Sequence, residues 1–191
     1  MQPIHRIWIM ALVAGTVVTA CNNKQPDSVK EADQTNEQRS DSSQNMVSTD
    51  DAQFVTEAAS GGMMEVELGN YAGTAAKSKG VKDFGAMMVR DHSRMGDELK
   101  NLATRKNLVV PQTMGNDQQQ MVERLRKKTG AEFDKDYIDM MVNDHKEDIE
   151  KFRKEAESGK DADIRALASS ALPILQAHLD SAQALQNSMK R

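Results

Sequence analysis

Cysteine and aromatic residues are scarce in this chain of 191 residues. The sequence has one cysteine, Cys21, and only 4% of its residues are aromatic. A single cysteine excludes a disulfide within the chain. With 13 methionines and few aromatic rings, a core must be built from Leu, Ala, Val, Ile and Met. That composition favours helices packed on helices over a β-sheet.

Basic stripes and the common catalytic signatures are also missing. The 25 basic and 29 acidic residues are intermingled and give a net charge of −4, which argues against a nucleic-acid partner. No phosphate-binding loop, CxxC pair or Ser-His-Asp order is present. Since nothing supplies an activated nucleophile, we do not expect an enzyme unless a bound metal has an open coordination position.

The N-terminal residues have the pattern of an export signal. A short basic start precedes an apolar run from Ile7 to Ala20, which is too short to span a membrane. The run ends in Val18-Thr19-Ala20-Cys21, which resembles a bacterial lipobox. We expect residues 1–20 to be a signal peptide and Cys21 to carry the lipid that anchors the protein to a membrane. The alternative is a plain signal peptide with an incidental cysteine.

The remaining chain divides by composition into a tether and one domain. Residues 22–50 have scarcely an apolar side chain, so we expect 21–50 to be a lipidated, disordered tether. From residue 51 to 191, apolar residues recur at helical spacing. We expect four long helices, at 51–79, 81–106, 131–157 and 161–189. A short helix at 117–128 is expected within the long connection between the second and third of them. This is the pattern of a ferritin-like four-helix bundle with a long crossover.

One helical stretch occurs twice: Met87–His92 is matched further along by Met140–His145. Each of the four long helices carries one titratable residue in its apolar stripe, and these residues are Glu65, His92, His145 and His178. Counted from the turns at 1.5 Å per residue, Glu65 and His92 lie about 20 Å from one bundle end, and His145 and His178 lie within about 4.5 Å of one level, so all four are near mid-helix. Burying such groups without partners is costly, so we expect them to meet.

Three imidazoles and a carboxylate are a suitable ligand set for one transition metal, Zn, Cu or Ni. The chain lacks the Glu-x-x-His motif of di-iron bundles. Asp91 and Asp144 precede two of the histidines and are candidates to orient them from outside the ligand set. The methionine pairs 63–64, 87–88 and 140–141 are candidate soft ligands for Cu(I). The alternative is a buried polar network that only fixes helix packing.

Two further local features carry expectations. Gly61-Gly62 interrupts a helical stretch and predicts close helix contact or a local bulge. The charged residues Lys146-Glu147-Asp148 are expected to be solvated surface.

The domain resembles a family of bacterial exported proteins that is described as predicted outer membrane proteins and contains domain of unknown function 4142. The resemblance extends from Phe54 to about Leu185. The segments that carry it are Gly61–Val66, Val81–Gly85, Met88–His92, Gly130–Asp134, Tyr137, Asp144–His145, Leu172–Pro173 and His178. It implies a ferritin-like helical bundle in the cell envelope, on the outer membrane facing the periplasm. It implies no activity, so two functions stay open: a metal- or ligand-binding protein, or a structural or stress-related module that contacts an unknown protein partner.

Overall fold

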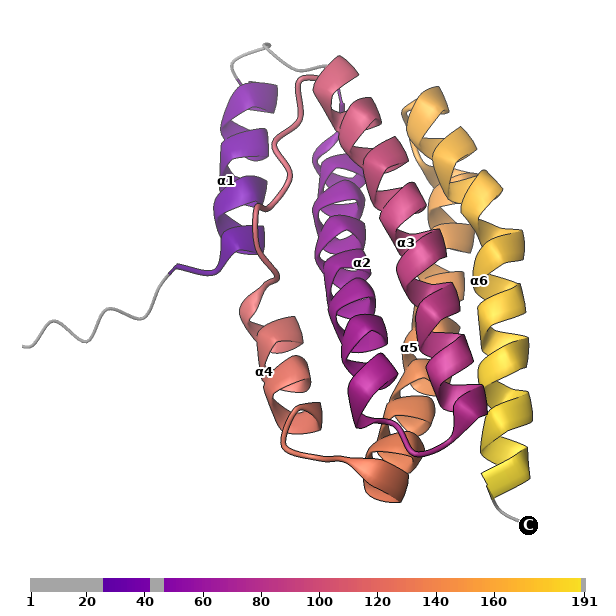
Figure 1. The fold of residues 1–191 in the computed structure, drawn as a ribbon. Helices are drawn as coiled ribbons and strands as arrows, with labels where there is room; N and C mark the ends of the chain where they lie inside the picture. The colour runs from indigo at the N-terminus through magenta and orange to yellow at the C-terminus, as the bar shows by residue number, and fades with distance from the viewer. Residues whose placement is uncertain (1–25, 42–46, 190–191) are drawn as a thin grey trace, which may run out of the picture.

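The computed structural model describes residues 26–41 and 47–189, and this part of the chain is all-helical (Figure 1). The helices are α1 (Ser28–Asp41), α2 (Thr49–Ala75), α3 (Lys79–Arg105), α4 (Asn116–Leu125), α5 (Gly130–Ser158) and α6 (Ala162–Met189). The expected all-α class is confirmed. The predicted bounds of the four long helices differ from the observed ones by only a few residues.

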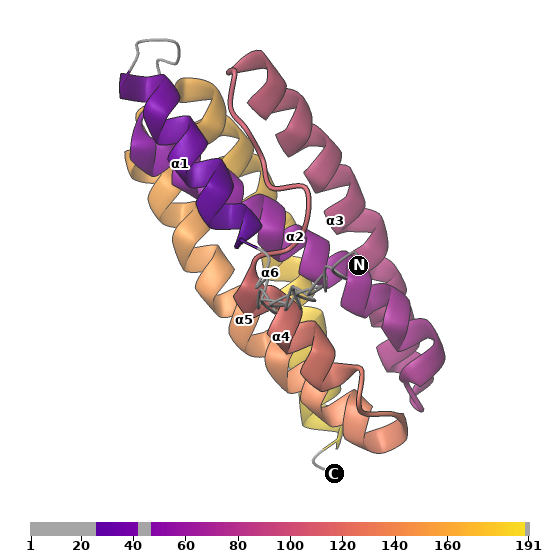
Figure 2. The ribbon, with the colours of Figure 1, turned by 90° about the vertical axis from the view of Figure 1, so that its left-hand side faces the viewer.

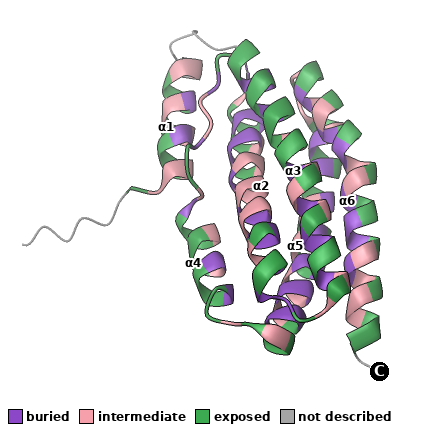
Figure 3. Ribbon diagram, viewed as in Figure 1, coloured by how far each residue is buried: buried purple, intermediate pink, exposed green. Residues whose placement is uncertain are grey.

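The four long helices pack as two antiparallel hairpins. The most extensive contacts join α2 to α3 and α5 to α6, and α3 also packs on α6 and α2 on α5. Figures 1 and 2 show these four helices side by side, with α1 and α4 on the outer side of α2. Buried residues face the interior of this arrangement, and the outward faces are exposed (Figure 3). The apolar stripes predicted from the sequence form one large hydrophobic cluster and a smaller second cluster that includes Val55, Leu102 and Ile164.

Helix α1 is a correction to the expected tether. Residues Ser28–Asp41 form a helix that packs against α2, although its only apolar side chains are Val29 and Ala32. Polar groups hold it in place: the side chain of Asn36 donates to the carbonyl of Val109 and accepts from its amide, and Ser28 donates to the carbonyl of Thr113. Sequence periodicity missed the helix because α1 is held by hydrogen bonds to the connection after α3 and not by an apolar stripe.

Each hairpin turn is tied to the other hairpin by one buried aspartate. Asp134 on α5 accepts hydrogen bonds from the backbone amides of Lys77 and Ser78, between α2 and α3. Asp51 on α2 accepts hydrogen bonds from the amides of residues 160 and 161, between α5 and α6. Amide bonds to a carboxylate are stronger than those to a neutral acceptor. They fix the relative height of the hairpins and hence of the residues at mid-helix.

Helices α2 and α3 approach most closely at Gly69 and Gly85. A Cβ atom added to Gly85 would lie 2.8 Å from the Gly69 carbonyl oxygen, and one added to Gly69 would lie 2.6 Å from the Gly85 oxygen. By contrast, nothing lies within 4 Å of a Cβ added to Gly61 or Gly62. The expectation that the glycine pair marks a close helix contact was therefore wrong, because that face of α2 borders open space.

Within the described residues, no helix is both long and apolar enough to span a membrane. The predicted signal peptide (1–20) and the predicted lipid attachment at Cys21 lie outside the described residues.

Candidate metal centre

The four titratable residues predicted to meet lie together in the middle of the helix assembly. Glu65 on α2, His92 on α3, His145 on α5 and His178 on α6 are each at least 96% buried. Each lies on its helix among core residues, next to apolar neighbours such as Met88 on α3 and Leu175 on α6. The interior therefore contains three imidazoles and one carboxyl group that are almost fully shielded from solvent.

Three ring nitrogens converge on one point. The Nδ1 atom of His178 lies 3.3 Å from the Nε2 atom of His92 and 3.3 Å from the Nε2 atom of His145. One such nitrogen from each histidine lies within 4.8 Å of the other two. Nitrogens bonded to one tetrahedral zinc at 2.0–2.1 Å are about 3.3 Å apart. The spacing thus fits a shared metal, and it lies at the long end of the range for a hydrogen bond between rings.

The hydrogen-bond partners of the outer nitrogens fix the tautomers of two rings. His145 Nδ1 lies 3.1 Å from the carbonyl oxygen of Met141, which only accepts, so this nitrogen carries the hydrogen. His178 Nε2 lies 3.1 Å from the Asp91 carboxylate and also donates. The inner nitrogens, His145 Nε2 and His178 Nδ1, are 3.3 Å apart, and each therefore directs a lone pair at the other with no hydrogen between them. Two facing lone pairs are unfavourable unless a cation or a proton lies between them.

Protonation does not supply that cation at neutral pH. Burial lowers the pKa of His92 to about 4, and burial together with the two neighbouring rings lowers that of His145 to about 3. Burial also lowers the pKa of His178, although its hydrogen bond to Asp91 opposes the shift. All three imidazoles are accordingly neutral near pH 7, the form in which histidine binds metals.

Glu65 completes the arrangement. Its Oε2 atom lies 2.7 Å from His92 Nδ1, and its Oε1 atom lies 3.5 Å from His145 Nε2 and has no hydrogen-bond partner. Burial, and the nearby charge of Asp148, raise the pKa of Glu65 well above its ordinary value. The raised pKa means that burial disfavours the ionised carboxylate in the metal-free protein, despite the short distance to His92. A cation at the centre would favour the ionised carboxylate. That carboxylate accepts a hydrogen bond from His92 Nδ1, so His92 Nε2 presents a lone pair to the centre.

The two aspartates predicted to orient histidines have different surroundings. Asp91 bonds to His178, on another helix, and not to the adjacent His92. Burial acts to raise its pKa, but hydrogen bonds from Arg90 and His178 outweigh burial and lower it. Asp144 has one oxygen within 4.8 Å of Glu65 and His145, while its Oδ2 atom is buried without a hydrogen-bond partner. Burial and the charge of Glu65 raise its pKa well above the ordinary value.

Two polar residues near the centre were missed by sequence reasoning. Asp148, expected at the solvated surface, is only partly exposed, and burial raises its pKa to about 6. Tyr137 is fully buried with an unpartnered hydroxyl, and the charges of Glu65 and Asp144 raise its pKa further beyond the effect of burial. Asp148 follows Asp144 by one helical turn, which is the one signal that places it on the inner side of α5.

The two methionines of each pair differ in burial, because adjacent residues on a helix face different directions. Met64, Met88 and Met141 are fully buried in the hydrophobic core. Their neighbours Met63, Met87 and Met140 are half-buried, and among these three only Met63 lines the groove beside Glu65 and His92. The pairs therefore do not present two sulfurs each to one place.

Two solved structures share the fold over most of this chain. CopM in its Cu(II)-bound form is 15% identical, with a TM-score of 0.61 over 72% of this chain and 96% of CopM. A conserved hypothetical protein from Mycobacterium tuberculosis is 13% identical, with a TM-score of 0.54 over 73% of this chain and 92% of that protein. At these identities the likeness concerns the fold alone. No curated protein matches the sequence.

The family resemblance noted from the sequence is confirmed. The model of the domain of unknown function DUF4142 matches residues 36–185, which include α2 to α5, nearly all of α6 and all four residues of the centre. The match begins within α1, ahead of the domain start expected at residue 51. The chain belongs to the DUF4142 family.

Proposed function

We propose that the protein binds one divalent transition-metal ion between the imidazoles of His92, His145 and His178, with Glu65 as the fourth ligand. The observation that carries the proposal is the pair of unprotonated nitrogens, His145 Nε2 and His178 Nδ1, that face each other at 3.3 Å inside the core. A packing network accounts for the contact in which His92 Nε2 can donate to His178 Nδ1, but it leaves no hydrogen between His145 Nε2 and His178 Nδ1. Here the outer partners of both rings hold the hydrogens away from the centre.

The donor set selects the class of metal. Three imidazole nitrogens and one carboxylate suit Zn²⁺, Cu²⁺ or Ni²⁺, and do not suit Mg²⁺ or Ca²⁺, which prefer oxygen. The structural neighbour CopM was solved in a Cu(II)-bound form, which adds support for copper within this class. We further infer that the four long helices form a ferritin-like bundle, with residues 106–129 as the long crossover that contains α4.

The proposal assigns a binding role and not a reaction. With Glu65 as ligand, the four side chains fill a tetrahedral shell, as in structural metal sites. Asp91 and the Met141 carbonyl hold His178 and His145 in the tautomers that direct a lone pair inward.

Metal content is the direct test. Protein purified without chelators or affinity metals should contain about one equivalent of Zn, Cu or Ni by elemental analysis, and adding that metal to the stripped protein should raise the melting temperature. At 100-fold excess over Kd, binding to the folded state alone stabilises it by about 2.7 kcal/mol. His92→Ala and His145→Ala should each lose both effects while retaining a helical circular dichroism spectrum.

The competing function is a structural or stress-related interaction module whose polar centre only specifies packing. It predicts less than about 0.1 equivalent of any transition metal and no thermal shift with Zn²⁺, Cu²⁺ or Ni²⁺. Each histidine substitution would then cost a few kcal/mol with no dependence on metal. That result would end the metal-binding proposal.

We also propose that the protein is exported and held at the outer membrane, facing the periplasm, through acyl chains on Cys21. The support is the lipobox-like Val18–Cys21 sequence after a short apolar run. Growth with a fatty-acid analogue should label the wild-type protein and not Cys21→Ser. Labelling of both proteins, or of neither, would contradict the anchor.

A further inference from the structure

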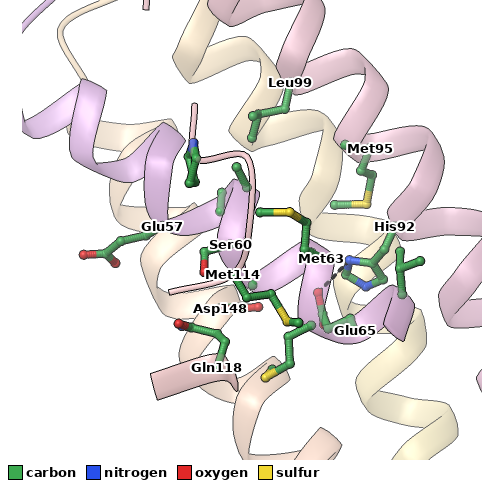
Figure 4. A pocket seen from close by; sticks show the side chains of 18 of the residues that line it. Glu57, Ser60, Met63, Glu65, His92, Met95, Leu99, Met114, Gln118 and Asp148 are labelled. Carbon is green, nitrogen blue, oxygen red and sulfur yellow. Dashed lines mark ion pairs between the residues drawn. The ribbon is translucent and has the colours of Figure 1, made fainter. Parts of the chain in front are cut away.

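A groove leads from the surface to the edge of the histidine centre. It has a volume of about 1560 Å³ and is lined by parts of all six helices and by the connection that follows α3. Glu65 and His92 form part of its wall (Figure 4). Asp144 also lines it. His145 and His178 do not line it. The groove is therefore a separate space that shares one wall with the proposed centre.

Methionine sulfurs enter this groove from several segments. Met63 on α2, Met95 on α3, Met114 in the connection and Met121 on α4 are half-buried and line it. Figure 4 shows Met63, Met95 and Met114 extending into the space beside Glu65 and His92. Thioethers are soft ligands that select Cu(I) over harder cations. Segments distant in sequence thus bring soft donors to one cavity.

Packing does not account for all of these methionines. Met63 belongs to neither hydrophobic cluster of the described residues, whereas Met95, Met114 and Met121 pack against the main cluster, as do Met87 and Met140 outside the groove. Next to Met63, Gly61 and Gly62 also line the groove, and a Cβ added to either would meet nothing within 4 Å. The glycines keep space open beside a thioether that fills no gap in the core.

The charge of the lining favours a cation. Ten carboxyl side chains and five Lys or Arg side chains line the groove. Clefts lined by one sign of charge raise the local concentration of the opposite ion. The excess of carboxyl groups over basic groups favours a small cation in the groove, and thioethers favour a soft one.

We propose that this groove holds a thioether site for a soft monovalent cation, Cu(I) or Ag(I), separate from the imidazole centre. Met63 and Met95 are its central ligands, and Met114 and Met121 complete it. The proposal does not depend on the function assigned to the histidines, because the two sites use different donors and favour different ions.

Silver titration of methyl-labelled protein tests the site. Ag⁺ is the probe because it does not change oxidation state, and the background is Cys21→Ser, because a free thiolate would bind Ag⁺ itself. In a methyl NMR spectrum, one equivalent of Ag⁺ should shift the methyl signals of Met63, Met95, Met114 and Met121. The signals of Met87 and Met140 should stay unchanged. In Met63→Leu/Met95→Leu the affinity for Ag⁺ should fall at least tenfold, at nearly constant volume.

Two variants make the result decisive. Met87→Leu/Met140→Leu removes two equally half-buried methionines outside the groove and should leave the affinity for Ag⁺ unchanged. His92→Ala/His145→Ala should also retain Ag⁺ binding. If Ag⁺ binding disappears with the histidines and survives loss of Met63 and Met95, or if the wild type binds no Ag⁺, the groove site is excluded. Zn²⁺ binding measured on the same variants reports separately on the imidazole centre.

Discussion

Replacing Glu65 with glutamine is expected to stabilise the metal-free protein and, at the same time, to weaken metal binding. The amide has the same shape and its oxygen still accepts from His92 Nδ1, but it is never ionised. Because burial disfavours the ionised form of Glu65 and leaves one oxygen unpartnered, replacing the ionisable group by an amide should raise metal-free stability by about 1–2 kcal/mol at pH 7. An amide is a neutral, weaker ligand, so the affinity for Zn²⁺ should fall about 10- to 100-fold. Thermal melts with and without metal measure both effects.

The pH dependence of this gain separates charge from packing. Burial raises the folded-state pKa of Glu65, so between its unfolded and folded pKa values the folded state holds more protons than the unfolded state. Stability from this group is therefore present at low pH and is lost as pH rises through that window. The advantage of Glu65→Gln over wild type should be small near pH 4 and larger at pH 7.

The matched control is Glu57→Gln on the same helix, where the carboxylate is exposed, and it should change stability by less than about 0.5 kcal/mol. Equal metal affinity in Glu65→Gln and wild type would remove Glu65 from the ligand set. If metal-free Glu65→Gln is less stable than wild type at pH 7, the ionisable carboxyl group of Glu65 does not lower the stability of the metal-free protein.

Replacing Gly85 with alanine should destabilise the protein, although alanine is the better helix former. The new methyl group would lie 2.8 Å from both the Gly69 carbonyl oxygen and the Ala72 Cβ, so α2 and α3 must separate. We expect a loss of about 2–3 kcal/mol, a melting temperature lower by roughly 4–12 °C, because overpacking against a backbone relaxes poorly. Gly69 follows Glu65 by one turn, so the same separation should weaken the Glu65–His92 contact and metal binding.

Two exposed helical glycines serve as controls. A Cβ added to Gly73 on α2 or to Gly96 on α3 meets nothing within 4 Å. Gly73→Ala and Gly96→Ala should therefore stabilise the protein by about 0.5–1 kcal/mol through helix propensity alone. If Gly85→Ala behaves like these two variants, the close contact does not limit stability.

The sequence predicted which residues meet, because a titratable group inside an apolar helical stripe has one direction to face. Glu65, His92, His145 and His178 were found from spacing and from the repeat of Met87–His92. Spacing along one helix says nothing about partners on another helix. For that reason Asp91 was assigned to His92 in the sequence and lies against His178 in the structure. Asp148 was likewise taken for surface, since its charge suggested exposure.

By itself, the sequence determined the four long helices and α4, the inward faces of the long helices and the residue types available at the centre, because helical periodicity is local and depends on the order of apolar residues. The tertiary structure alone decided the rest. It showed that α1 packs through polar groups, that Gly69 and Gly85 and not Gly61-Gly62 join two helices, and that four segments bring methionines to one groove. It also set the tautomers of His145 and His178 through a carbonyl and a carboxylate. These features depend on distances between segments far apart in the chain, which no local pattern encodes.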